Sequence, residues 1–157
     1  MPMRIALVAV GQRMPAWVRE AFDEYAKRLQ PRLPVTLVEI PAGKRSGGDA
    51  ARAVEDEGRR LLEKLRADDH VVLLDERGRT RTSLEHSRWL GQRLQQGRNL
   101  AFLVGGPDGF APAVQQRGDE RWSLSSLTLP HALVRIVWIE QMYRAVTLLD
   151  GHPYHRE

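Results

Sequence analysis

The chain has 157 residues, of which 42% are hydrophobic and 28% charged, with a net charge of +4 and no cysteine. This composition is ordinary for a globular protein and excludes an intrinsically disordered or collagen-like chain, and the length favours a single domain over residues 1–157. The absence of cysteine excludes a disulfide framework, cysteine-bound zinc, an iron–sulfur cluster and a thiolate nucleophile of the kind that attacks an RNA base.

Five short apolar segments have the character of strands that are buried on both faces. Each is bounded by Gly, Pro or Asp and is apolar without strict alternation, as expected for strands covered on both sides. They are residues 4–10, 35–40, 70–75, 100–104 and 126–129.

Helical patterns fill the intervals between these segments. The first helix is amphipathic, and the second begins near Asp49, which is its expected N-cap. The third opens with a possible capping box formed by Thr82 and Glu85, and a short helix follows Pro112. The last, over 133–149, is apolar almost all round, so we expect it to be buried or to lie in a subunit interface.

The alternation of strands and helices predicts an α/β fold, with a mainly parallel sheet flanked by helices. In such sheets ligands bind outside the carboxyl ends of the strands, which directs attention to the segments there. One is the loop 105–109, Gly-Gly-Pro-Asp-Gly, whose glycines allow close approach of a ligand. It is neither a dinucleotide fingerprint nor a P-loop, and by itself it is more typical of a tight turn than of a ligand site.

The segment 124–129, Leu-Ser-Ser-Leu-Thr-Leu, mixes leucines with serine and threonine. Main-chain polar groups beside apolar walls suit a flat heterocycle such as adenine. The alternative is a buried strand whose Ser and Thr side chains bond to neighbouring backbone, and the sequence favours neither. Similarly, the loop 41–49 is basic and could contact an RNA backbone, or it could be a solvated loop that ends at the helix cap.

The last residues, 152–157, are rich in side chains that stack, titrate and bind phosphate. Tyr154 could stack on an unpaired base, His155 could move a proton near neutral pH, and Arg156 could hold a phosphate. Glu140 and Arg144 lie four residues apart on the last helix, where an ordinary ion pair is the simpler interpretation, so we treat them as weaker candidates. Two histidines without a third ligand do not make a typical metal site, and we expect no metal.

The charge is unevenly distributed, and 19 Lys and Arg face 14 Asp and Glu within residues 1–99. Because arginine predominates, an anionic partner such as RNA is compatible with this half, although solvated helix faces are the simpler explanation of the charge alone. No segment approaches the roughly 20 apolar residues of a spanning helix, and no secretory signal is evident. We therefore expect a cytoplasmic protein that does not use a membrane.

Several segments together resemble one family, the small SPOUT methyltransferases that modify N3 of a pseudouridine in large-subunit (23S) ribosomal RNA. The resemblance spans essentially the whole chain. It rests on residues 8–11, 40–45, 74–75, 105–109, 124–131 and the ending 152–157, His-Pro-Tyr-His-Arg-Glu.

The resemblance implies an α/β fold with a C-terminal trefoil knot, a homodimer that packs knot against knot, and a ribosomal RNA or ribosome substrate. It also implies S-adenosyl-L-methionine as cofactor. The contacts carried over by position are Leu74, Gly105, Leu124, Ser125, Ser126, Leu127, Thr128 and Leu129.

Methyl transfer to N3 requires that the N3 proton be accepted or the resulting anion stabilised. We expect Tyr154 to orient the base, His155 to assist proton removal and Arg156 to hold phosphate or developing charge, with the tail of one subunit completing the pocket of the other. The alternatives are a SPOUT methyltransferase acting on transfer RNA and a ribosome-binding protein without catalysis. A flavodoxin-like nucleotide enzyme is disfavoured by the missing phosphate loop.

Overall fold

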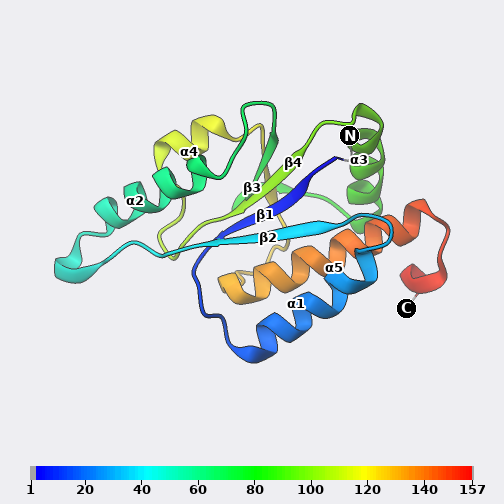
Figure 1. Cartoon of the computed structure of the whole chain (residues 1–157), viewed down its shortest axis with the longest axis horizontal. Helices are drawn as coiled ribbons and strands as arrows, with labels where there is room; N and C mark the ends of the chain where they lie inside the picture. The colour runs from blue at the N-terminus through cyan, green and yellow to red at the C-terminus, as the bar shows by residue number, and fades with distance from the viewer. Residues whose placement is uncertain (1–2, 157) are drawn as a thin grey trace.

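Five parallel strands form one sheet in the order β2-β1-β4-β3-β5 (Figure 1). The computed structural model describes residues 3–156, except for the side chains of Ser46, His155 and Arg156. The strands are β1 (Ile5–Val10), β2 (Val35–Ile40), β3 (His70–Thr80), β4 (Leu100–Val104) and β5 (Glu120–Ser123). The helices are α1 (Ala16–Leu29), α2 (Ala50–Glu63), α3 (Ser83–Gln96), α4 (Pro112–Arg117) and α5 (His131–Leu149), with short 3₁₀ turns η1 (Ser46–Gly48) and η2 (Pro153–Arg156).

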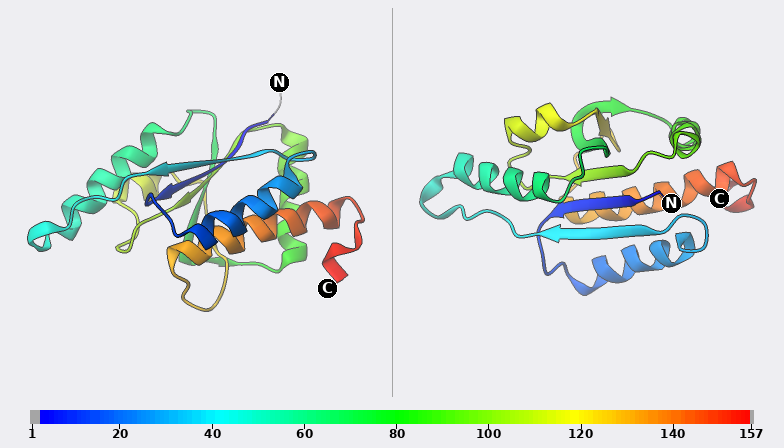
Figure 2. Two further views of the ribbon diagram at one scale, coloured as in Figure 1. Left: turned by 60° about the horizontal axis from the view of Figure 1, so that its bottom comes forward. Right: turned by 45° about the horizontal axis from the view of Figure 1, so that its top comes forward.

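Helices cover both faces of the sheet, which makes a three-layer α/β sandwich. Figures 1 and 2 show α2 and α4 on one side and α1 and α5 on the other, where α3 also packs against α5. Alternate residues of β1 therefore enter different cores: Ile5 and Leu7 pack with α1, α3 and α5, whereas Ala6 and Val8 pack with α2 and α4. Because both faces are covered, every residue of β1 is buried, and the α/β fold expected from the sequence is confirmed.

Local side chains fix where the helices begin, as the sequence predicted. The Asp49 carboxylate accepts a hydrogen bond from the backbone N–H of Arg52 at 3.1 Å and caps α2. Thr82 and Glu85 form the reciprocal capping box of α3, at 3.1 and 3.0 Å. These contacts satisfy N–H groups that the first helical turn leaves without partners.

Helix α5 runs across one face of the sheet and anchors it. Trp138 is 1% exposed and packs on Phe102 of β4, with ring centroids 5.0 Å apart. Arg135 is equally buried. It forms an ion pair with Glu39 of β2 and donates to the carbonyl of Gly11 at 2.8 Å. The outward side of the same helix carries half-buried and exposed apolar residues, among them Leu133.

The predicted fifth strand, over 126–129, is wrong. The strand is β5, Glu120–Ser123, and 126–129 belongs to an irregular loop in which Leu127 is 71% exposed. The reason is that the Leu127 N–H bonds to the Ser125 hydroxyl at 2.9 Å rather than to a neighbouring strand. β3 is also longer than predicted: beyond a register shift between Leu74 and Arg79 it pairs again with β5.

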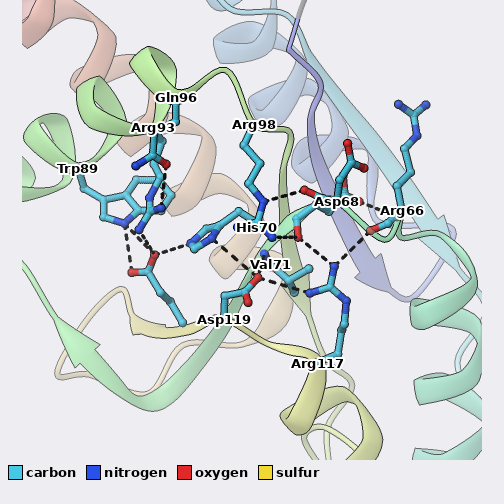
Figure 3. Close-up of polar contacts among 12 residues, drawn as sticks. Arg66, Asp68, His70, Val71, Trp89, Arg93, Gln96, Arg98, Arg117 and Asp119 are labelled. Atoms are coloured by element: carbon cyan, nitrogen blue, oxygen red, sulfur yellow. Dashed lines mark hydrogen bonds and ion pairs between the residues drawn. The ribbon is translucent and has the colours of Figure 1, made fainter.

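A dense polar network marks the amino-terminal edge of the sheet, opposite the ends at which a ligand is expected (Figure 3). Glu120 accepts hydrogen bonds from His70 at 2.6 Å, Trp89 at 2.9 Å, Trp122 at 3.2 Å and Arg93 at 3.2 Å. Burial of this carboxyl opposes its ionisation, but the hydrogen bonds from His70, Trp122 and Trp89 outweigh that effect and lower its pKa. The network ties the starts of β3 and β5 to α3.

Candidate functional site

The main cavity opens where the chain leaves neighbouring strands in opposite directions. The connection after β3 leads to α3 on the α5 side of the sheet, whereas the connection after β4 leads to α4 on the other side. Such a divergence leaves a crevice at the carboxyl ends of the strands. The cavity there measures about 410 Å³, which lies within the size range of small-molecule sites.

Three segments line the cavity, and they are those that the sequence singled out. Of the predicted cofactor contacts, those on its wall are Leu74, Gly105, Leu124, Ser125, Leu127, Thr128 and Leu129. Ser126 lies in the same loop but is exposed and is not part of the lining. Residues far apart in the sequence thus converge on one hollow.

The glycine loop after β4 is a tight turn that also forms one wall of the cavity. The N–H of Gly109 donates to the carbonyl of Gly106 at 3.1 Å, and Gly109 has a φ of 83°, which favours glycine. A Cβ on Gly105 would lie 3.2 Å from the ring of Phe110 and 3.3 Å from the carbonyl oxygen of Gly109. Space beside Gly105 is therefore already filled, and a branched side chain there would push against Phe110 and Gly109, which also line the cavity.

The loop from Ser123 to Pro130 forms the facing wall and is held by its own side chains. The Ser123 hydroxyl donates to the carbonyl of Ser125 at 2.7 Å, and the Thr128 hydroxyl donates to Glu76 of β3 at 3.3 Å. Residues 124–130 of this loop are not paired in the sheet, so their main-chain polar groups are not used in strand pairing, and Leu124 and Leu129 line the cavity beside them. This is the combination of apolar wall and polar main chain that a flat heterocycle requires.

Charged side chains also line the cavity, and sequence reasoning missed their role. Asp75, Glu76 and Asp108 bring three carboxylates, while Arg77 and His131 are the basic groups of the lining. The Asp75 side chain is 14% exposed and accepts from the backbone N–H of Arg77 at 3.0 Å. Acidic groups that outnumber basic ones suit a ligand that carries positive charge.

The C-terminal turn η2 packs back onto α5 rather than into the cavity of its own chain. The Tyr154 hydroxyl donates to Glu140 at 2.8 Å, and the Arg144 guanidinium lies 5.0 Å from the centre of the Tyr154 ring. Arg144 also pairs with Glu140 at 2.8 Å, as its spacing suggested. Burial and the hydrogen bond to Glu140 raise the pKa of Tyr154, so this hydroxyl stays protonated near neutral pH. The side chains of His155 and Arg156 lie outside the described residues.

The cavity and the tail are separated along α5. Val134 is the last residue of α5 in the cavity lining, whereas Tyr154 meets α5 at Glu140, six residues further on, and packs on the ring of Tyr143. At a rise of 1.5 Å per residue, Val134 and Glu140 are about 9 Å apart along the helix axis. Figure 2 shows the tail beyond the end of α5 that is remote from the loop 123–130. Within one chain, Tyr154 therefore contacts α5 and not the predicted cofactor-binding residues.

Apart from the side chains of Ser46, His155 and Arg156, which are not described, residues 3–156 contain no group of three or more His, Asp or Glu arranged to hold a metal ion. Over the same range, none of the helices has the length and apolarity needed to traverse a bilayer.

Comparison with known proteins agrees with this geometry. The family described as "Predicted SPOUT methyltransferase" matches residues 3–155. The chain is 54% identical to the ribosomal RNA large subunit methyltransferase H of Thioalkalivibrio sulfidiphilus, over 99% of this chain and all of the relative. Proteins of the same name from Alkalilimnicola ehrlichii and Stenotrophomonas maltophilia are 52% and 50% identical, each over 98% of this chain and 99% of the relative. With an α/β sheet that gathers three loops around one cavity and a match over nearly its full length, the chain belongs to the SPOUT methyltransferase family.

Proposed function

We propose that the protein transfers a methyl group from S-adenosyl-L-methionine to N3 of a pseudouridine in 23S ribosomal RNA, on the large subunit or the assembled ribosome. The observation that carries the proposal is the cavity at the ends of β3, β4 and β5, in a chain that matches large-subunit ribosomal RNA methyltransferases from end to end. A ribosomal substrate in turn places the protein in the cytoplasm.

The cavity suits S-adenosyl-L-methionine by size, wall chemistry and charge. Main-chain groups of 124–129 would hydrogen-bond the adenine edge between Leu124 and Leu129, and Gly105 would contact the donor from the glycine loop. Asp75 and Glu76 would face the positive charge of the ligand. When bound, the cofactor supplies an electrophilic methyl group on a sulfonium centre.

The chain's own contribution to the reaction is orientation and proton handling. Holding the methyl group in line with N3 converts an encounter between two molecules into a step within one complex, worth up to about 7–11 kcal/mol in ideal cases. We assign Tyr154 to orienting the base, His155 to accepting the N3 proton, and Arg156 to holding phosphate or the charge that develops on a carbonyl. Glu140 and Arg144 act through Tyr154, which they hold in place.

We further propose that the active unit is a homodimer in which the tail of one subunit serves the cavity of the other. Two observations support this. The tail and the cavity are separated along α5, and the outward side of α5 carries apolar side chains such as Leu133, which is 37% exposed. The proposal of a C-terminal trefoil knot in this chain rests on the match to the SPOUT methyltransferase family over residues 3–155.

The experiment that tests the reaction uses methyl-labelled S-adenosyl-L-methionine and ribosomes from a strain that lacks the protein. We expect label in one pseudouridine of 23S ribosomal RNA, located by mass mapping of RNA fragments. Label in transfer RNA instead would identify a different substrate. Ribosome binding without consumption of the cofactor would show a binding protein and refute the enzyme assignment.

A mixing experiment tests the shared site. One variant lacks residues 152–157, and the other carries Gly105→Val and keeps its tail. Neither should be active alone, whereas random exchange of subunits should restore about one quarter of wild-type activity, since half of the dimers then hold one complete site of two. No recovery on mixing, with subunit exchange verified by mass, would contradict a shared site.

A further inference from the structure

A buried carboxylate lies behind the glycine loop of the cavity. Glu57 of α2 has a side chain only 2% exposed. Its carboxylate accepts hydrogen bonds from the backbone N–H of Gly43 at 2.9 Å and from the guanidinium of Arg45 at 2.9 and 3.3 Å. A buried carboxylate is unfavourable unless it is paired and hydrogen-bonded, so these three contacts explain how Glu57 is tolerated.

The space around Glu57 is shaped by two glycines. A Cβ on Gly106, in the loop that lines the cavity, would lie 2.8 Å from a carboxylate oxygen of Glu57. A Cβ on Gly43 would lie 2.5 Å from the carbonyl oxygen of Ala53 in α2. Both loops therefore approach α2 more closely than any other residue type would allow, and Glu57 lies between them.

Arg45 joins this buried group to the cavity wall. Its Nε donates to the carboxylate of Asp108 at 2.8 Å, while its terminal nitrogens hold Glu57 and the carbonyl of Gly43. One planar guanidinium thus spans two carboxylates on different segments, which a lysine ammonium cannot reproduce. The hydrogen bonds from Glu57 and Asp108 raise the pKa of Arg45, which keeps it charged.

We propose that Arg45 is a positioning residue for the methyl donor, because through Glu57 and Asp108 it fixes the loop Gly105–Gly109 against α2. The inference rests on the proposed function, since it concerns the donor cavity. Within the loop, the N–H of Gly109 bonds to the carbonyl of Gly106, and Gly109 has a φ of 83°, which favours glycine. The ion pair between Asp108 and Arg45 ties the loop to a second segment of the chain. If the loop had to become ordered when the donor binds, the entropy lost would reduce the affinity for the donor. Because Arg45 fixes the loop beforehand, it strengthens donor binding.

This role differs from the one that the basic loop 41–49 suggested. Arg45 is half-buried and engaged with two carboxylates, whereas its neighbour Lys44 is exposed. Lys44 and Arg45 are adjacent in the loop but therefore have different surroundings. Lys44 is exposed to solvent, and Arg45 is placed to hold the cavity wall.

The test compares four full-length variants: Arg45→Met, Arg45→Lys, Asp108→Asn and the matched control Lys44→Met. Binding of S-adenosyl-L-methionine is measured by calorimetry, and initial rates are measured at saturating ribosomes while the donor is varied. We expect Arg45→Met to raise the Kd and the KM for the donor about tenfold, about 1.4 kcal/mol, with a much smaller change in kcat. Arg45→Lys should fall between wild type and Arg45→Met, Asp108→Asn should weaken binding about threefold, and Lys44→Met should bind the donor as wild type does.

The outcomes are separable. Wild-type donor affinity in folded Arg45→Met overturns the inference, and so does a loss of ribosome affinity in that variant with donor affinity unchanged. If Arg45→Met does not fold, Arg45→Lys and Asp108→Asn decide, and unchanged donor binding in both overturns the inference. If the wild-type protein itself does not bind the donor, the proposed function fails first and the inference falls with it.

Discussion

His86 should make the protein sensitive to mild acid. Its side chain is 6% exposed and stacks on Trp122 with ring centroids 4.6 Å apart, and its Nε2 has no hydrogen-bond partner among the described residues. Burial lowers its pKa from 6.5 to about 4, and the nearby Arg81 lowers it further than Glu85 raises it. The folded protein therefore keeps His86 neutral at a pH where the unfolded chain takes up a proton.

The sign and size of the effect follow from that difference in proton uptake. Because the folded pKa is depressed, stability is unaffected well above pH 6.5 and falls as the pH drops from 6.5 toward 4. Between pH 7 and pH 5 the loss from this residue alone amounts to about 2 kcal/mol. For a domain of this size, a loss of about 2 kcal/mol lowers Tm by roughly 4–8 °C.

Urea unfolding at pH 7 and pH 5, followed by tryptophan fluorescence, measures this loss. We expect His86→Phe, which keeps an aromatic ring on Trp122, to lose about 2 kcal/mol less than wild type over the same interval. His86→Gln, which cannot titrate either, serves as the second variant. An equal loss of stability in wild type and both variants would refute the reasoning.

Three further predictions concern the cavity, a helix cap and the polar network. Gly105→Val should crowd the donor cavity and abolish measurable donor binding in calorimetry while circular dichroism stays native, and normal affinity would refute the cavity assignment. Thr82→Ala removes the N-cap of α3 and should cost about 1 kcal/mol in urea unfolding, with the exposed Thr36→Ala as a comparison. Because the pKa of Glu120 is lowered in the folded protein, its ionised carboxylate should add stability above pH 4.5, and this stability should be lost as the pH falls through the folded pKa. In Glu120→Gln, the free energy of unfolding should therefore depend less on pH in this acidic range.

Most of the fold could be predicted because the strong signals are local. Four of the predicted strands and all five helices correspond to the observed elements, and the caps at Asp49 and Thr82 form as expected. The fifth strand was predicted at the wrong residues because the apolar content of 126–129 was taken as the sign of a buried strand. The segment 124–129 is apolar because it lines a cavity, whereas β5 carries the single large apolar residue Trp122 between polar neighbours at the sheet edge.

The candidate site was predictable only in part. The rule that ligands bind at the carboxyl ends of parallel strands, together with the family resemblance, pointed to Gly105 and to 124–129, and all of these except Ser126 line the cavity. Glu57 gave no signal, because in the sequence it ends an acidic run of the kind that normally faces solvent. Only the close approach of Gly43 and Gly106 to α2 makes it a buried partner for Arg45.

The spacing between tail and cavity along α5 bears on how the enzyme responds to dilution. If the groups that handle the base come from a second copy, an isolated chain has both a cavity and a tail, but its tail does not reach its own cavity. Below the concentration at which pairs dissociate, turnover would then cease while every chain still captured its methyl donor. Chains at low concentration would be inactive until they dimerised, and the methylation rate would rise more steeply than in proportion to the concentration of chains.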